Sequence, residues 1–82
     1  MKAYVLINTR TGEVRDVVRQ LAKVEGVSEA NMTFGPYDAL AILTANDINH
    51  LGKILASSIQ PIPGVTHTLT LLAVESSAVR RI

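Results

Sequence analysis

Two segments of the chain repeat one arrangement, and this repeat restricts the fold more than any other feature. A helical pattern is followed by Gly26-Val27 and a strand, and 38 residues later a second helical pattern is followed by Gly64-Val65 and a strand. Two βαβ-like units of this length are typical of a split, ferredoxin-like sheet. Because crossover connections are right-handed, few other topologies remain. The sequence therefore predicts an α+β, βαββαβ sandwich: an antiparallel four-stranded sheet with two helices on one face.

Local patterns place the elements of this fold. Runs rich in β-branched and aromatic residues predict strands over residues 2–9, 27–34, 37–45 and 65–74. Helical spacing of apolar residues predicts a first helix that starts at Thr11 and stops at Gly26. A second helix follows Asn46 or Asp47 as N-cap and ends at the prolines of residues 60–64. Its predicted apolar stripe is Ile48, Leu51, Leu55 and Ile59.

The composition holds more apolar material than one small core can bury. Of 82 residues, 48% are hydrophobic and 18% are charged, and a domain of this size buries only about 60% of its unfolded surface. Side chains alternate across a strand, and both faces are apolar in the strands over 2–9 and 37–45. The two helices cover one face, so we expect a second copy of the chain to cover the other, with about 600–800 Å² buried on each partner.

Several classes of protein are disfavoured by charge and composition. The net charge is +1 and the basic residues are scattered, whereas nucleic-acid binding needs clustered cations. The chain has no cysteine, and therefore no disulfide or thiolate chemistry. It has no apolar run of 18 residues and no leader-like start. We expect a cytoplasmic protein that binds neither nucleic acid directly nor a membrane.

No arrangement of residues indicates catalysis. His50 and His67 are isolated, and each is expected to be a surface or interface residue. No metal-ligand spacing, paired carboxylates or Ser-His-acid set can be assembled. The glycines are separate turn residues and form no phosphate-binding loop. The sequence predicts a protein that is not an enzyme and uses no cofactor.

Two stretches admit both a structural and a functional interpretation. In Gly35-Pro36-Tyr37-Asp38, the Asp38 carboxylate either accepts hydrogen bonds from amides of a tight turn or binds an ammonium group, as in a free amino acid. In the strand over 65–74, Thr66, Thr68 and Thr70 share one face. They reflect either β propensity on a solvated face or the lining of a polar pocket between subunits.

The motifs G-x-Y-D over residues 35–38 and P-G-V-x-x-T-x-T over residues 63–70, in this order and spacing, carry a resemblance to a known family. The chain resembles the effector (RAM, regulation of amino acid metabolism) domain of the Lrp/AsnC transcriptional regulators, from residue 2 to about residue 75. The resemblance implies dimers formed through the sheets and rings of dimers, commonly octamers. It also implies a small effector, usually an amino acid, bound between dimers.

By similarity, Gly35, Tyr37 and Asp38 correspond to the effector loop, with Asp38 the candidate for the ammonium group. By the same similarity, Met32 and Ile48 match positions near the side-chain pocket of the effector, and residues of the fourth strand match its other side. The predicted effector-binding set is Met32, Gly35, Tyr37, Asp38, Ile48, Thr68, Thr70, Leu71 and Leu72.

The resemblance also suggests how the domain would act. Family members carry an N-terminal helix-turn-helix domain, whereas here residue 2 already opens the first effector strand. We expect residues 1–75 to form a stand-alone effector and oligomerisation domain without a DNA-binding domain, and residues 76–82 to form a tail. Such a domain would sense an amino acid and act through partners, for example full-length regulators.

Two alternatives come from other classes of protein. One is a purely structural oligomerisation module without a ligand. The other is a small enzyme built as a dimeric α/β barrel, which needs an ionisable group on the sheet face. Among Tyr4, Leu6, Leu40 and Ile42 only the phenol of Tyr4 meets that need.

Overall fold

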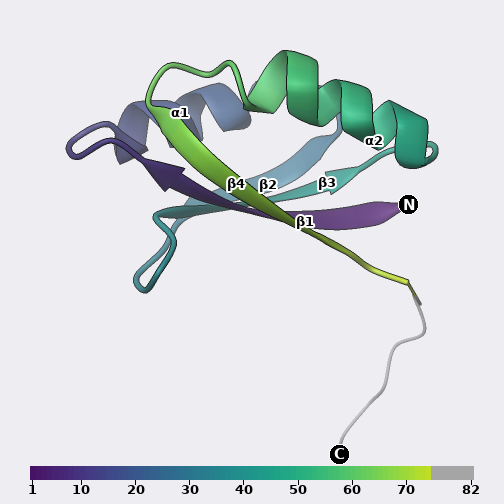
Figure 1. Cartoon of the computed structure of the whole chain (residues 1–82), viewed down its shortest axis with the longest axis horizontal. Coiled ribbons are helices and arrows are strands. Elements are labelled where there is room, and N and C mark those ends of the chain that lie inside the picture. The colour runs from purple at the N-terminus through teal and green to yellow at the C-terminus, as the bar shows by residue number, and fades with distance from the viewer. Residues whose placement is uncertain (75–82) are drawn as a thin grey trace, which may run out of the picture.

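A computed structural model of the chain describes residues 1–74. The elements follow in the order β1 (Lys2–Thr9), α1 (Val14–Leu21), β2 (Val27–Met32), β3 (Ala39–Thr44), α2 (Ile48–Ile54), η1 (Leu55–Ile59) and β4 (Val65–Leu72). The four strands form one antiparallel sheet in the order β2-β3-β1-β4. Both helices lie on the same side of this sheet (Figure 1). The predicted βαββαβ, ferredoxin-like fold is confirmed.

The core lies between the helices and one face of the sheet. Ala3, Val5 and Ile7 of β1 are fully buried there, as predicted from strand alternation. The remaining buried residues come from β3, the helices and the segments that follow β3 and η1: Val17, Leu21, Ala39, Ala41, Leu43, Ala45, Leu51, Ile54, Ile59 and Ile62. We call this side of the sheet the helix-covered face.

The opposite side is apolar over β3, β1 and β4 and has no covering layer in the described chain, whereas β2 contributes the polar residues Glu29 and Asn31 to it. Residues directly opposite one another in antiparallel strands point to the same side. Leu6 pairs with Leu40 on β3 and with Leu69 on β4, and Tyr4 pairs in the same way with Ile42 and Leu71. We call this side the open face and define its apolar patch by six residues: Tyr4, Leu6, Leu40, Ile42, Leu69 and Leu71. Leu69 and Leu71 keep 42% and 50% of their surface exposed.

The two halves of the chain meet through equivalent glycines. Gly26 and Gly64 both have positive φ, +94° and +100°, which glycine adopts without strain. The carbonyl of Gly26 accepts from the Thr44 N–H at 2.9 Å, and that of Gly64 accepts from the Arg10 N–H at 2.8 Å. Each glycine thus connects the end of one helical segment to the other half, as the repeat in the sequence indicates.

The first helix differs from the prediction at both ends. α1 begins at Val14, and Thr11 lies outside it in a turn. Glu13 precedes the helix and its side chain makes no capping hydrogen bond. The helix ends at Leu21, five residues before Gly26. Turns with their own backbone hydrogen bonds connect Leu21 to Gly26. Val24 still packs against the core from this turn segment.

The N-cap of α2 is Asp47, one of the two residues predicted for that position. Its Oδ1 accepts from the His50 N–H at 2.8 Å. In return, His50 Nδ1 accepts from the Asn46 N–H at 2.9 Å. This pair satisfies two backbone donors at the start of the helix; it differs from a capping box in that the second donor precedes the N-cap residue.

The predicted apolar stripe of the second helix is partly wrong. Ile48 is the first helical residue and is 55% exposed, so it is not part of the core. The helix continues as the π-helical segment η1, in which the repeat widens. Ile54 and Ile59 are five residues apart and both are buried. A strict α-helical repeat does not place positions five apart on one face.

The strand boundaries shift by one or two residues. β1 has the predicted bounds, β2 ends at Met32 and β4 at Leu72. β3 runs from Ala39 to Thr44, so the loop between β2 and β3 covers residues 33–38. No helix within residues 1–74 is long and apolar enough to cross a membrane.

Candidate functional site

The loop over residues 33–38 forms a closed hairpin. The Thr33 N–H donates to the Asp38 carbonyl at 3.0 Å, and the Thr33 hydroxyl donates to the Tyr37 carbonyl at 2.7 Å. Gly35 has a φ of +133°, and a Cβ there would meet no heavy atom within 4 Å. Backbone conformation, and not crowding, is therefore the reason for glycine at this position.

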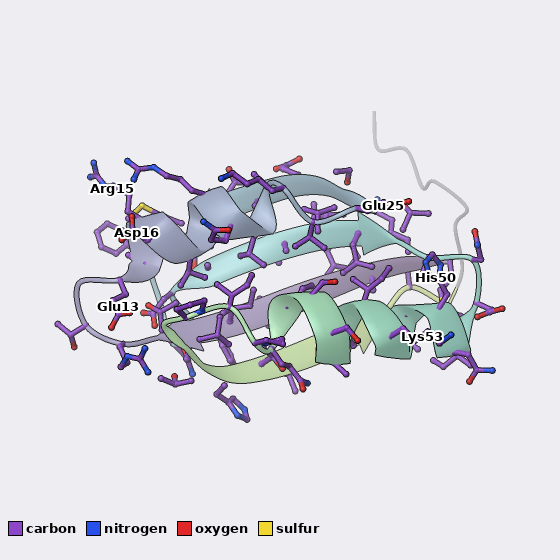
Figure 2. The ribbon with its side chains drawn as sticks, turned by 90° about the horizontal axis from the view of Figure 1, so that it is seen from above. Glu13, Arg15, Asp16, Glu25, His50 and Lys53 are labelled. Atoms are coloured by element: carbon purple, nitrogen blue, oxygen red, sulfur yellow. The ribbon has the colours of Figure 1, made fainter. Side chains whose placement is uncertain are left out.

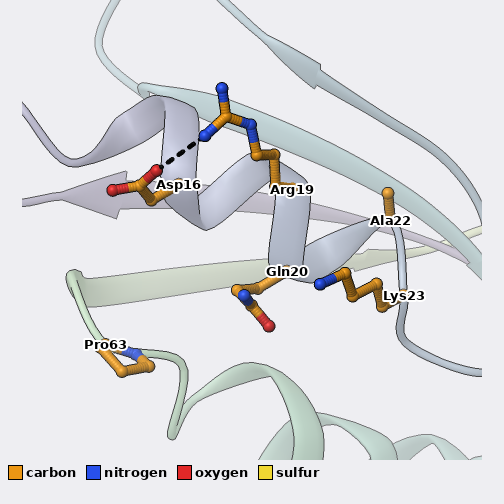
Figure 3. Close-up of a pocket in the computed structure, with 6 residues that line it drawn as sticks. All are labelled: Asp16, Arg19, Gln20, Ala22, Lys23 and Pro63. Atoms are coloured by element: carbon orange, nitrogen blue, oxygen red, sulfur yellow. Dashed lines mark hydrogen bonds and ion pairs between the residues drawn. The ribbon is translucent and has the colours of Figure 1, made fainter.

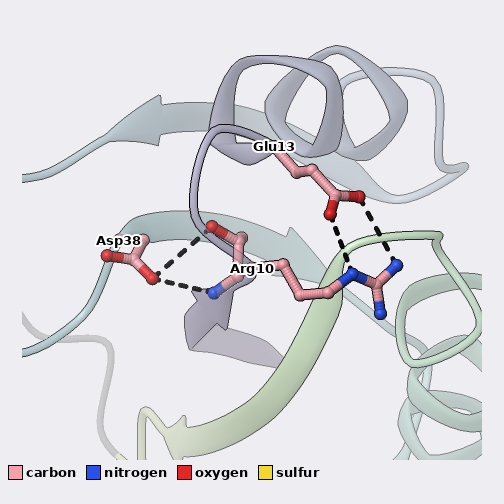
Figure 4. A network of polar contacts seen from close by, with 4 residues as sticks. Arg10, Glu13 and Asp38 are labelled. Atoms are coloured by element: carbon pink, nitrogen blue, oxygen red, sulfur yellow. Dashed lines mark hydrogen bonds and ion pairs between the residues drawn. The ribbon is translucent and has the colours of Figure 1, made fainter.

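The Asp38 carboxylate ties the hairpin to the end of β1. Its Oδ2 accepts from the Thr9 N–H at 2.8 Å and lies 3.5 Å from the Thr9 hydroxyl (Figure 4). The Asp38 N–H donates to the Ile7 carbonyl at 2.9 Å. The acceptor role expected for Asp38 is present, but the donor belongs to β1 and not to the turn. Within the described residues Oδ1 accepts no hydrogen bond.

The segment that holds Asp38 is itself fixed. Arg10 Nε donates to Glu13 Oε2 at 2.8 Å (Figure 4). The hydrogen bond with Glu13, supported by its charge, raises the pKa of Arg10. The Arg10 N–H is bound to the Gly64 carbonyl. The turn from β1 to α1 is thus held on both sides, and Asp38 is positioned by a chain segment that is far from it in sequence.

Three of the predicted effector residues lie together in the hairpin: Gly35, Tyr37 and Asp38. Met32 ends β2 opposite Ala39 and is 51% exposed. Thr68 lies opposite Ile7, at the same end of the sheet. Because β1 separates β3 from β4 and strands are about 4.8 Å apart, Thr68 and Ala39 are about 10 Å from each other.

The remaining predicted residues do not join this group within one chain. Thr70 and Leu72 lie opposite Val5 and Ala3, on the helix-covered face, whereas Leu71 belongs to the open face. Ile48 opens α2, which follows the other end of β3. The neighbouring His50 lies at the end of the molecule opposite Glu13 and Asp16 (Figure 2). A six-residue strand is about 17–20 Å long, so a small ligand at Asp38 cannot reach Ile48 of the same chain.

An apolar groove runs from the hairpin onto the open face. Its volume is about 360 Å³, and no charged residue lines it. Leu6 and Leu40 come from the sheet, and Thr33, Phe34, Pro36 and Tyr37 from the hairpin. Phe34 is fully exposed, at 108% of its reference area.

A larger hollow of about 760 Å³ lies on the other side of the molecule and contains none of the predicted residues. Pro63 faces α1 across it (Figure 3), and the remaining lining residues are Asp16, Arg19, Gln20, Ala22 and Lys23. Arg19 and Asp16 form an exposed ion pair at 3.1 Å. The hollow is open and its charges are of both signs, so it indicates no ligand class.

The family model of the Lrp/AsnC ligand binding domain matches residues 2–81. The chain belongs to the Lrp/AsnC family. Among curated relatives, the HTH-type transcriptional regulator FL11 of Pyrococcus abyssi is 34% identical over 74 residues, which are 88% of this chain and 48% of FL11. Uncharacterised HTH-type regulators of Pyrococcus are covered over 39–41% of their length. This Lrp/AsnC domain thus spans half or less of the curated relatives it matches.

Solved structures match the Lrp/AsnC domain over nearly its whole length. TTHA0845 of Thermus thermophilus is 31% identical with a TM-score of 0.89, and the match covers 95% of this chain and 98% of that chain. The transcriptional regulator NMB0573 of Neisseria meningitidis is 15% identical with a TM-score of 0.84, over 95% of this chain and 52% of that chain. The second likeness shows the fold alone.

Phe34 is the residue of this Lrp/AsnC domain that sequence reasoning missed. The sequence pattern placed it at the end of the strand over 27–34, whereas it lies in the loop after β2, which ends at Met32.

The two histidines lie apart: His50 is in the first turn of α2 and its Nδ1 accepts from the Asn46 N–H, and His67 is exposed on β4 opposite Asn8. Within residues 1–74 no three His, Cys, Asp or Glu side chains are grouped as a metal site.

Proposed function

We propose that this Lrp/AsnC domain binds a free amino acid at the hairpin and couples this binding to the assembly of copies of the chain. The coupled output is the regulation of transcription, the role by which its relatives are named. The domain acts without catalysis, in the cytoplasm, as a homo-oligomer built from dimers, such as an octamer. Full-length regulators of the same family are candidate partners.

The observation that carries this proposal is the half-buried carboxylate of Asp38. One oxygen is fixed by Thr9, and the other accepts no hydrogen bond within the described residues. A carboxylate held in this way is a preorganised acceptor for an ammonium group, and charge-assisted hydrogen bonds of this kind are stronger than neutral ones. NMB0573, which shares this fold over 52% of its chain, was solved as a complex with L-methionine, and this supports an amino acid as the ligand class.

The distribution of the predicted residues supports a site shared between copies. Asp38 and Ile48 of one copy lie beyond opposite ends of β3. Leu71 and Leu72 point to opposite faces of the sheet from β4. A ligand that contacts several of these positions needs elements of more than one subunit. A ligand of this kind stabilises the assembled state by its differential affinity for that state.

The apolar patch of the open face supports the dimer. It brings six large side chains together on one side of the sheet, and soluble monomers rarely expose contiguous apolar surface beyond a few hundred Å². A second copy placed face to face covers the patch by the packing of two sheets about 10 Å apart.

A thermal-shift screen against the twenty amino acids tests the ligand. A ligand present at about 100 times its dissociation constant adds about 2.7 kcal/mol per site, which raises the unfolding temperature of a domain of this size by several degrees or more. We expect a selective shift that Asp38→Asn abolishes, because the amide still accepts from Thr9 but carries no charge.

Asp16→Asn is the matched control, since this carboxylate is exposed on α1 and remote from the hairpin. If no amino acid shifts the transition, the amino-acid ligand is wrong. If in addition the chain assembles normally, the result favours the structural oligomerisation module over the amino-acid sensor. If Asp38→Asn retains the full shift, the ligand binds elsewhere.

A further inference from the structure

Phe34 is the most exposed large apolar residue within the described chain, and its loop is held in place. At 108% exposure the side chain is not buried by any described residue, although it borders the groove of its own chain. The hairpin around it is closed by two hydrogen bonds between residue 33 and residues 37 and 38. Asp38 anchors the same hairpin to Thr9. The ring is therefore presented to the surroundings by a fixed loop.

The hairpin projects to the side of the sheet that the helices leave free. Figure 1 shows the loop between β2 and β3 extending away from α1 and α2. The apolar groove of about 360 Å³ lies at its base, with Leu6 and Leu40 contributed by the open face. A projecting aromatic side chain and an apolar groove thus occur next to each other on the same side of one chain.

This pairing has the character of a self-complementary interface. In a dimer with two-fold symmetry, a contact from residue i of one copy to residue j of the other is repeated from j to i. The interface therefore needs both a projecting group and its receptor on the same chain, and the hairpin and groove supply both. Aromatic anchors in desolvated pockets are the residues that dominate such interfaces.

We propose that Phe34 of one copy packs into the groove formed by Leu6, Leu40, Pro36 and Tyr37 of a second copy, and that the reciprocal contact completes a two-fold pair. The occupant of the groove is thus a second copy of this chain. The inference rests on the proposed assembly through the open face and adds which side chain anchors it. It also connects assembly to the effector, since Phe34 and Asp38 belong to one hairpin.

The absence of cysteine from the sequence allows a direct crosslinking test. Phe34→Cys and Leu40→Cys are made as two separate single variants and mixed under mild oxidation. The proposal expects a disulfide-linked heterodimer between the two variants. Separate variants are needed because Phe34 also lines the groove of its own chain, so that a double variant could close within one molecule. Leu6→Cys is a second groove position, and Ser57→Cys on the helix side is the negative control.

Equilibrium sedimentation of Phe34→Ala gives the independent measurement. Each Phe34 ring is expected to contribute about a factor of ten to the dimer association constant. Because a dimer of Phe34→Ala lacks both symmetric rings, we expect its dissociation constant to rise about 100-fold. Lys53→Ala is the control, because Lys53 is exposed on α2, on the helix side of the sheet and remote from the open face. We expect it to change the dimer constant by less than about threefold. Far-ultraviolet circular dichroism of all variants is expected to match the wild type.

The outcomes separate this inference from the proposed assembly. A wild-type dimer that survives Phe34→Ala unchanged overturns the inference and leaves the dimer intact. A disulfide that links Phe34→Cys to itself and not to Leu40→Cys also overturns it, because the hairpin tips then meet each other. A wild-type chain that stays monomeric overturns both the assembly and its anchor.

Discussion

The two faces of the sheet are built from the same strands, yet they differ in what their side chains contact. On the helix-covered face, Val5 and Ala41 lie opposite one another and are fully buried. On the open face, the next pair along, Tyr4 and Ile42, is only half-buried. Along β1 and β3 both faces are apolar, and the difference lies in the presence of a helical layer on one of them. Apolar patterning thus identifies surface that requires a cover, without specifying what provides it.

The comparison separates folding from association. Changes on the helix-covered face are expected to alter the free energy of unfolding of the single chain, whereas changes on the open face alter the association of copies. Two pairs of variants test this separation and two more examine the helical side alone, from the largest expected effect to the smallest.

Neighbouring charge substitutions on β1 give the largest contrast. Val5→Asp places an unpaired carboxylate in the core, where a buried charge is strongly destabilising, and we expect no folded protein. Leu6→Asp places the same group on the open face, and we expect a folded monomer. Circular dichroism and light scattering measure the two properties. A folded, dimeric Leu6→Asp variant would contradict the proposed interface.

Truncation of one leucine on each side gives the next largest contrast. Leu21→Ala empties a fully buried position and is expected to cost about 2–5 kcal/mol of unfolding free energy. Leu71→Ala removes a half-exposed side chain, with an effect on the monomer within about 0.5 kcal/mol. Urea denaturation at two protein concentrations checks both. Stability should depend less on concentration in Leu71→Ala than in the wild type, and an unchanged dependence would place Leu71 outside the interface.

Alanine substitutions at Gly26 and Gly64 compare how easily the two connections on the helix-covered side accept a Cβ. Alanine at either position has to adopt a positive φ, at about 1–2 kcal/mol. At Gly26 the new Cβ also lies 2.8 Å from the Thr44 carbonyl oxygen, whereas at Gly64 its nearest contacts are side-chain atoms of Glu13 and Val17 at 3.0 Å. Because backbone yields less than side chains, Gly26→Ala should be the more destabilising of the two in thermal unfolding. The reverse order would show that the segment around Thr44 shifts easily.

The smallest expected effect concerns the cap of α2. Asp47→Ala removes the acceptor for the His50 N–H and should cost about 1 kcal/mol of unfolding free energy. Asp16→Ala, which removes an exposed ion pair, should change stability by less than about 0.5 kcal/mol. Neither variant should alter the dimer constant measured by sedimentation. A weaker dimer in Asp47→Ala would show that the helical layer takes part in assembly.

Part of the candidate site could be predicted from the sequence. The G-x-Y-D motif places Gly35 and Asp38 in a turn, and the structure agrees. The donor to Asp38 could not be predicted, because Thr9 lies 29 residues away and no local pattern links the two. The exposure of Ile48 could not be predicted either. Apolar spacing indicates which face of a helix is buried, but not how far the sheet extends beneath that face.

The sequence alone determined the order of the elements, the repeat around Gly26 and Gly64, and the apolar character of both faces of β1 and β3. These properties depend on neighbours in the chain, on side-chain alternation and on helical spacing. The tertiary structure alone decided that Asp38 is bound to β1, that η1 brings Ile54 and Ile59 to one side, and that Phe34 projects beside an apolar groove. Each of these depends on where distant segments meet, because packing and long-range hydrogen bonds are fixed only when the sheet and helices come together.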